Sequence, residues 1–184
     1  LSPAESINSI TVGAFHSDLS GDYYANPHHR TDLLPNDSLF SPISRFGHGF
    51  RRSIKPEILF PGGRQLFRTP MLDGQTSYTI ERSIAAPGLK VAWDSNQPGS
   101  SSQTAYSRGT SNATALATRS AARIYDVLDT LRTEHNYQIP QRLMSVLIKA
   151  LLVHGAKQET DALQAIDGAL KNSEKSGNFK EIVS

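Results

Sequence analysis

The sequence predicts an α/β domain with its strands in the first part and its helices in the last part. Apolar runs before residue 95 are short and rich in β-branched residues, which is typical of buried strands. After Gly109, apolar and small residues instead recur at three- and four-residue steps, which is typical of helices. Of the 184 residues, 38% are hydrophobic and 20% are charged, and no apolar run is long enough to cross a bilayer. We therefore expect one globular domain of layered strands and helices.

The first strand is predicted within the apolar run 7–15, and the polar stretch 17–44 that follows predicts a long loop. Ile58-Leu59-Phe60 stands just before Pro61-Gly62-Gly63 and predicts a strand that ends in a tight turn. Further short strands are expected at 65–68, 77–82 and 90–93, with turns at Asp73-Gly74 and Pro87-Gly88. The polar stretch 95–103 predicts a flexible loop.

A long helix is predicted from Ser111 onward, because one stripe of apolar and small residues runs along it. The stripe consists of Ala113, Leu116, Ala117, Ser120, Ile124, Val127, Leu128 and Leu131. A second helix is expected from Pro140 to near Gly155, with Leu143, Val146, Leu147, Ala150 and Leu151 as its apolar residues. A third is expected over 159–170, carrying Ala162, Leu163, Ile166 and Leu170. We assign residues 1–171 to the domain and residues 172–184 to a polar, frayed tail.

Charge and cysteine content exclude several classes of function. The net charge of +2 gives no support for a nucleic-acid or membrane partner. The only dense basic cluster, formed by Arg45, Arg51, Arg52 and Lys55, is interpreted as a solvated loop face. The absence of cysteine excludes a thiol nucleophile, a disulfide and a cysteine-ligated zinc. Together with the lack of a recognisable signal segment, it favours a cytoplasmic over a secreted location.

Six histidines offer no convincing base or metal site. The pair His28-His29 lies near Asp32, but without a third spaced ligand it is interpreted as a solvated pair. His154 falls in the last turn of the second predicted helix, where a cation suits the helix dipole, and is interpreted as structural. No calcium-binding loop is present either, so we expect neither a metal nor a cofactor.

The sharpest local feature is Gly109-Thr110-Ser111-Asn112-Ala113, where a serine stands between a glycine-containing loop and a helix of small residues. Unpaired N–H groups and the helix dipole put partial positive charge at such a point. The N–H of Ser111 would therefore stabilise an oxyanion that develops beside it. The bland alternative is that Ser111 or Thr110 is only the N-cap of the helix, and the local motif taken alone favours that alternative.

The wider sequence resembles the subtilase family of serine endopeptidases. Gly109-Thr110-Ser111-x-Ala113 is similar to the family's serine signature. Upstream, in the family's order, stand counterparts of its Val-Gly-Ala strand (9–14), its "fSs-G" turn (43–47) and its "KPdivaPG" strand and turn (55–62). Downstream, 147–156 resembles the helix that follows the nucleophile helix. Asn112-Ala113-Thr114-Ala115 replaces the usual Met-Ala-Ser-Pro, a departure that concerns the subfamily rather than the nucleophile.

The resemblance implies a three-layer subtilisin-like fold, a parallel sheet flanked by helices, of which this chain carries the C-terminal part of the catalytic domain. The region 64–107 is longer than in compact members and implies an inserted β-hairpin near the site. Ser111 would be the catalytic nucleophile, and Thr110 would support the oxyanion site. Leu1, Ser2, Pro3, Ala4 and Gly109 would bind a polypeptide substrate.

The resemblance also shows what the sequence lacks, since none of its histidines stands in the family's His-Gly-Thr context. The chain alone is therefore expected to be inert and to self-associate through exposed sheet edges or apolar surface. One alternative is a catalytically degenerate subtilase that serves as a binding or scaffold module. Another, an unrelated α/β hydrolase, is disfavoured because Ser111 lacks the Gly-x-Ser-x-Gly context.

Overall fold

The computed structural model describes residues 4–17, 30–34, 39–68, 77–82, 84–94, 99, 102–134, 138–157 and 164. Its centre is a pair of parallel strands, β1 (Val12–Phe15) and β5 (Ile58–Pro61), in which Val12 pairs with Ile58 and Phe15 with Pro61. Both strands were predicted, and their parallel pairing agrees with an α/β architecture. Ala14 and Ile58 are buried, so the strand pair forms part of the core.

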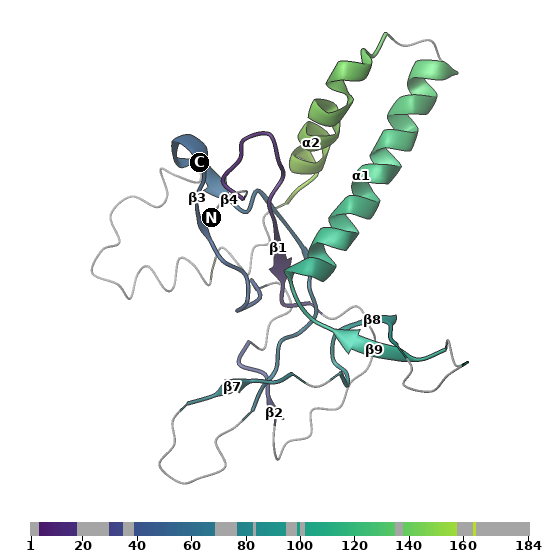
Figure 1. Cartoon of the computed structure of the whole chain (residues 1–184). Coiled ribbons are helices and arrows are strands. Elements are labelled where there is room, and N and C mark those ends of the chain that lie inside the picture. Colours follow the sequence, from purple (N-terminus) through teal and green to yellow (C-terminus); the bar gives the residue numbers. More distant parts are fainter. Residues whose placement is uncertain are drawn as a thin grey trace.

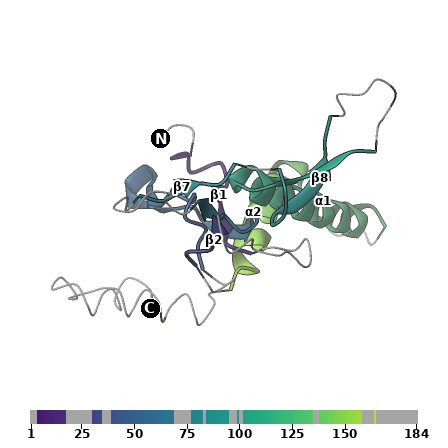
Figure 2. The same cartoon turned by 90° about the horizontal axis from the view of Figure 1, so that it is seen from below.

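One helix packs on this pair, and a second helix packs on the first. Helix α1 (Thr110–Thr133) lies against β1 and β5, and α2 (Met144–His154) lies against α1 (Figures 1 and 2). Buried Ala113 and Ala117 are small, which lets α1 approach closely along its first half. A 3₁₀ turn, η2 (Gln141–Leu143), precedes α2, and the N–H of Gly155 closes α2 on the carbonyl oxygen of Leu151. The first two predicted helices are therefore confirmed.

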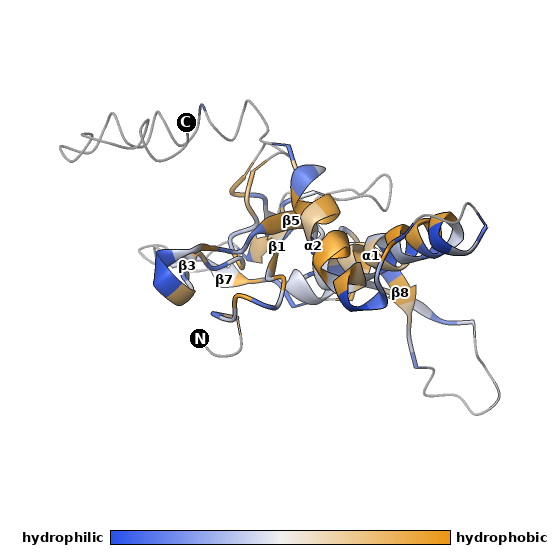
Figure 3. Cartoon of the chain, turned by 90° about the horizontal axis from the view of Figure 1, so that it is seen from above, coloured by the Kyte–Doolittle hydropathy of each residue, from blue (hydrophilic) through white to orange (hydrophobic). Residues whose placement is uncertain are grey.

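The predicted apolar faces of these helices are only partly buried. In α1, Ala113, Ala117 and Leu128 are buried, but Val127 is 59% exposed. In α2, Val146 is 61% exposed, and the buried residue is Met144. Eight of the eleven residues of α2 are apolar, so its periodicity could not distinguish a buried face from an exposed one. Figure 3, in which each residue is coloured by its hydropathy, shows hydrophobic residues along both helices.

The described strands other than β1 and β5 pair antiparallel. Strand β6 (Phe67–Arg68) lies between β2 (Arg30–Thr31) and β7 (Thr79–Ile80), and β8 (Leu89–Ala92) pairs with β9 (Thr104–Ser107). The strands expected at 65–68 and 77–82 are thus confirmed in shorter form, and the strand expected at 90–93 is confirmed one residue earlier. Strand β9 was not predicted, because polar Thr104, Tyr106 and Ser107 leave only Ala105 buried.

A hairpin that the sequence did not predict joins β3 (Gly47–His48) to β4 (Ile54–Lys55) through the 3₁₀ turn η1 (Phe50–Arg52). Arg51 and Arg52 on it, and Arg45 just before it, are exposed, as expected of a solvated face. The interpretation was wrong for Lys55, which is buried and paired with Glu57.

Other expectations lie outside the described residues: the turn at Asp73-Gly74, the His28-His29 pair, the tail 172–184 and, apart from Gln164, the helix over 159–170. No described helix is long and apolar enough to cross a membrane.

Candidate active site

Ser111 lies exposed in the first turn of α1. Figure 1 shows this helix beginning directly after β9. The N-cap is Gly109, with φ +147°, and no side chain caps the helix. Thr110 is therefore the first helical residue and Ser111 the second. The alternative in which Ser111 or Thr110 serves as the N-cap is wrong, because the glycine takes that position with a backbone conformation that other residues rarely adopt.

Close backbone contacts fix this turn on the core. The N–H of Gly109 donates to the carbonyl oxygen of Gly62 at 2.8 Å. A Cβ added to Gly62 would lie 2.4 Å from the Cβ of Ala14 and 3.1 Å from the carbonyl oxygen of Gly109. The glycine that follows β5 thus lets the strand pair and the start of α1 touch, which ties the position of Ser111 to the sheet.

Gly62→Ala is expected to destabilise the fold by about 1–3 kcal/mol, because the added methyl group overpacks the contact with Ala14. Denaturant unfolding would measure the loss. Gly47→Ala is the matched control, since a Cβ there meets no heavy atom within 4 Å. Equal stability of the two variants would show that the structure accommodates a methyl group at Gly62 with no loss in the free energy of unfolding.

Polar side chains surround the start of the helix. Arg108 Nε donates to the carbonyl oxygen of Pro87 at 2.6 Å, which joins the turn to the segment before β8. Ser107 Oγ lies 3.3 Å from Asn112 Oδ1. The buried Nδ2 of Asn112 has no hydrogen-bond partner within the part of the chain that the structure describes. Sequence reasoning did not single out Asn112.

Of the substrate-binding residues expected at the N-terminus, the structure describes only Ala4. Leu1, Ser2 and Pro3 lie outside the described residues. Ala4 is partly buried, and its carbonyl oxygen accepts a hydrogen bond from Thr11 Oγ1 at 2.8 Å. This bond connects Ala4 to the residue that immediately precedes β1.

A His–Asp pair with a buried histidine lies at the end of β1, and the sequence did not predict it. His16 is 0% exposed; its Nε2 lies 2.8 Å from Asp32 Oδ1, and its Nδ1 accepts the N–H of Gln65 at 3.3 Å. An Nδ1 that accepts an N–H carries no proton, so Nε2 carries it and donates to Asp32. With both ring nitrogens engaged and the ring buried, His16 is unsuited to take a proton from the exposed Ser111.

Asp32 is a shared acceptor. It also binds Arg64 Nε at 2.8 Å and the N–H of Leu34 at 3.0 Å. Burial acts to raise the pKa of Asp32, but the hydrogen bonds from His16, the Leu34 N–H and Arg64 outweigh it and hold the pKa below its ordinary value. The group therefore joins β1, the segment 30–34 and the chain after β5.

No group of three or more His, Asp or Glu side chains that could hold a metal ion occurs among the described residues. The site as the structure presents it is an exposed serine at a helix start, fixed by glycine contacts to a parallel strand pair.

This arrangement can be compared with known families. The model of the subtilase family matches residues 1–173. The chain belongs to the subtilase family. Neither a curated protein nor a solved structure matches the chain. Membership agrees with the mixed α/β structure, in which a small parallel sheet packs against helices, and it implies a serine peptidase with a polypeptide substrate.

Proposed function

We propose that Ser111 is the nucleophile of a serine endopeptidase that works through an acyl-enzyme. The observation that supports this proposal most directly is the exposed position of Ser111 in the first turn of α1. No side chain caps the N–H groups of this first turn, and the helix dipole favours negative charge there. A buried serine could not reach a peptide bond, whereas this one faces solvent. Family membership supplies the reaction class.

In the proposed reaction, Ser111 Oγ attacks the scissile carbonyl carbon and loses its proton to a general base. The resulting oxyanion receives the N–H of Ser111, and the hydroxyl of Thr110 supports that site. Gly109 and the segment Leu1, Ser2, Pro3 and Ala4 bind the substrate backbone. Collapse of the tetrahedral intermediate expels the amine with the proton from the base, and water then releases the acyl group.

We infer that the base and its aspartate belong to chain outside residues 1–184, and that this chain is the C-terminal part of a three-layer catalytic domain. The engagement of both His16 nitrogens supports this, because the described His–Asp pair is unsuited to the role. The 184-residue chain alone should show no peptidase turnover. Its exposed apolar helix surface, which includes Val127 and Val146, favours self-association.

Labelling with a fluorophosphonate tests the proposal. The complete protein should be modified stoichiometrically, with the adduct mapped to the peptide that carries Ser111, because these reagents phosphonylate activated serines. The 184-residue chain should remain unlabelled under the same conditions. Labelling of another serine would assign the nucleophile elsewhere. The absence of any label in a folded complete protein would favour a degenerate subtilase that binds rather than cleaves.

A further inference from the structure

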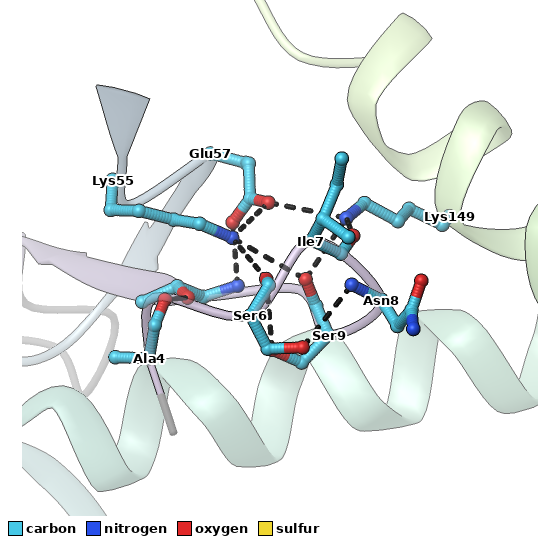
Figure 4. Close-up of polar contacts among 9 residues, drawn as sticks. Ala4, Ser6, Ile7, Asn8, Ser9, Lys55, Glu57 and Lys149 are labelled. Atoms are coloured by element: carbon cyan, nitrogen blue, oxygen red, sulfur yellow. Dashed lines mark hydrogen bonds and ion pairs between the residues drawn. The ribbon is translucent and has the colours of Figure 1, made fainter. Parts of the chain in front are cut away.

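The loop that precedes β1 is held by lysine side chains. Lys55 Nζ donates to the carbonyl oxygen of Ser6 at 2.9 Å and lies 3.5 Å from that of Ser9. Lys149 Nζ donates to the carbonyl oxygens of Ile7 at 2.6 Å and Ser9 at 2.9 Å (Figure 4). Three carbonyl groups of one short loop therefore point at two ammonium groups.

A single carboxylate joins the two lysines. Glu57 Oε1 lies 2.5 Å from Lys55 Nζ and 3.2 Å from Lys149 Nζ, while Oε2 accepts the N–H of Thr11 at 2.7 Å. Burial acts to raise the pKa of Glu57, but hydrogen bonds from Lys55, the Thr11 N–H and Lys149 hold it below its ordinary value. Each ammonium thus has three oxygen partners for its three N–H donors. The side chain of Lys55 is only 7% exposed, so its pair with Glu57 is not a surface ion pair, whereas the side chain of Lys149 is 29% exposed.

The cluster has one carboxylate for two ammonium groups. The second positive charge is balanced by carbonyl dipoles of the loop, as oxygen ligands balance a hard cation. Lys55 is buried and Lys149 is partly buried, so loss of either ammonium would leave carbonyl groups without their donors. The order of the loop therefore depends on these charges.

The cluster continues to the proposed substrate-binding segment. Thr11, whose N–H binds Glu57, donates its hydroxyl to the carbonyl oxygen of Ala4. The next carbonyl, that of Glu5, accepts the N–H of Phe50 at 3.0 Å. Lys149 belongs to α2 and lies 142 residues from Ile7 along the chain. A helix near the C-terminal end of the sequence therefore holds a loop near its N-terminal end.

We propose that Lys55, Glu57 and Lys149 form a clamp that fixes the loop Ala4–Ile10, and that Lys149 is thereby a positioning residue for substrate binding. The second part rests on the proposed function, in which Ala4 contacts substrate. The lysines touch no reacting atom: they hold the backbone of the loop, and the loop sets the place of the substrate-binding wall.

The test is Lys149→Met in the complete protein, a change that keeps an unbranched apolar stem and removes the ammonium. Amide hydrogen exchange across residues 4–11 should accelerate by about tenfold or more, while exchange in β8 and β9 stays unchanged. KM for a peptide substrate should rise roughly threefold to tenfold, with kcat within about twofold of wild type. Lys157→Met, at an exposed lysine just beyond α2, is the matched control and should change neither quantity.

Unchanged exchange across residues 4–11 would overturn the clamp, and faster exchange with an unchanged KM would overturn the positioning role. Exchange in β8 and β9 separates local release from general unfolding. If the wild-type protein takes no fluorophosphonate label, the proposed peptidase fails by itself. The clamp is then decided by exchange alone, since that measurement needs no catalytic activity.

Discussion

Ser111→Ala in the complete protein is expected to lower kcat by at least about 10⁴-fold, with KM changed by less than about threefold. The hydroxyl is the atom that forms the covalent bond in the proposed mechanism, and no neighbouring group replaces it. Ser111 is exposed and sits in a helix turn that its side chain does not cap, so alanine should leave the fold intact. Steady-state hydrolysis of a peptide substrate measures the effect.

Ser120→Ala is the matched control for this experiment. It makes the same chemical change on the same helix, in the third turn, and should retain full activity. Retention of substantial turnover by Ser111→Ala would assign the nucleophile elsewhere. Loss of turnover in both variants would point to damage to α1 rather than to catalysis.

Asp32→Ala is expected to lower the free energy of unfolding by about 3–5 kcal/mol at neutral pH. The carboxylate is the partner of both His16 and Arg64, whose side chains are 0% and 12% exposed. Removing it leaves a buried guanidinium and a buried ring N–H without that acceptor. Asp126→Ala, at an exposed position of α1, is the control and should have little effect. Denaturant unfolding compares the two.

The pH dependence gives an independent check on Asp32. A carboxyl whose folded pKa lies below its unfolded value stabilises the fold above the unfolded pKa, and the contribution is lost as pH falls through the folded pKa. Wild-type stability should therefore begin to fall near the ordinary value of 3.8 and continue to fall below it. Asp32→Ala should lack this part of the decline. A parallel decline in both proteins would show that other groups account for it.

Much of the fold could be predicted from local pattern. The β-branched run before Phe15 and the apolar residues before Pro61 each gave a strand of four residues. The periodicity after Gly109 gave α1 to within one residue of its start. Short strands such as β3 and β9 were missed, because two exposed residues or one buried alanine provide no periodic signal.

The sequence by itself determined the family, the order of the two core strands and the two helices, and the serine at the start of α1, since each is written in contiguous residues. Only the tertiary structure decided that Asp32 binds both His16 and Arg64, and that Lys149 reaches Ile7 and Glu57. Those partners lie 16 to 142 residues apart along the chain. Charged side chains carry no periodic mark of their partner, and a backbone carbonyl group, common to every residue, carries none at all. Which of them meet is settled only when the strands and helices pack.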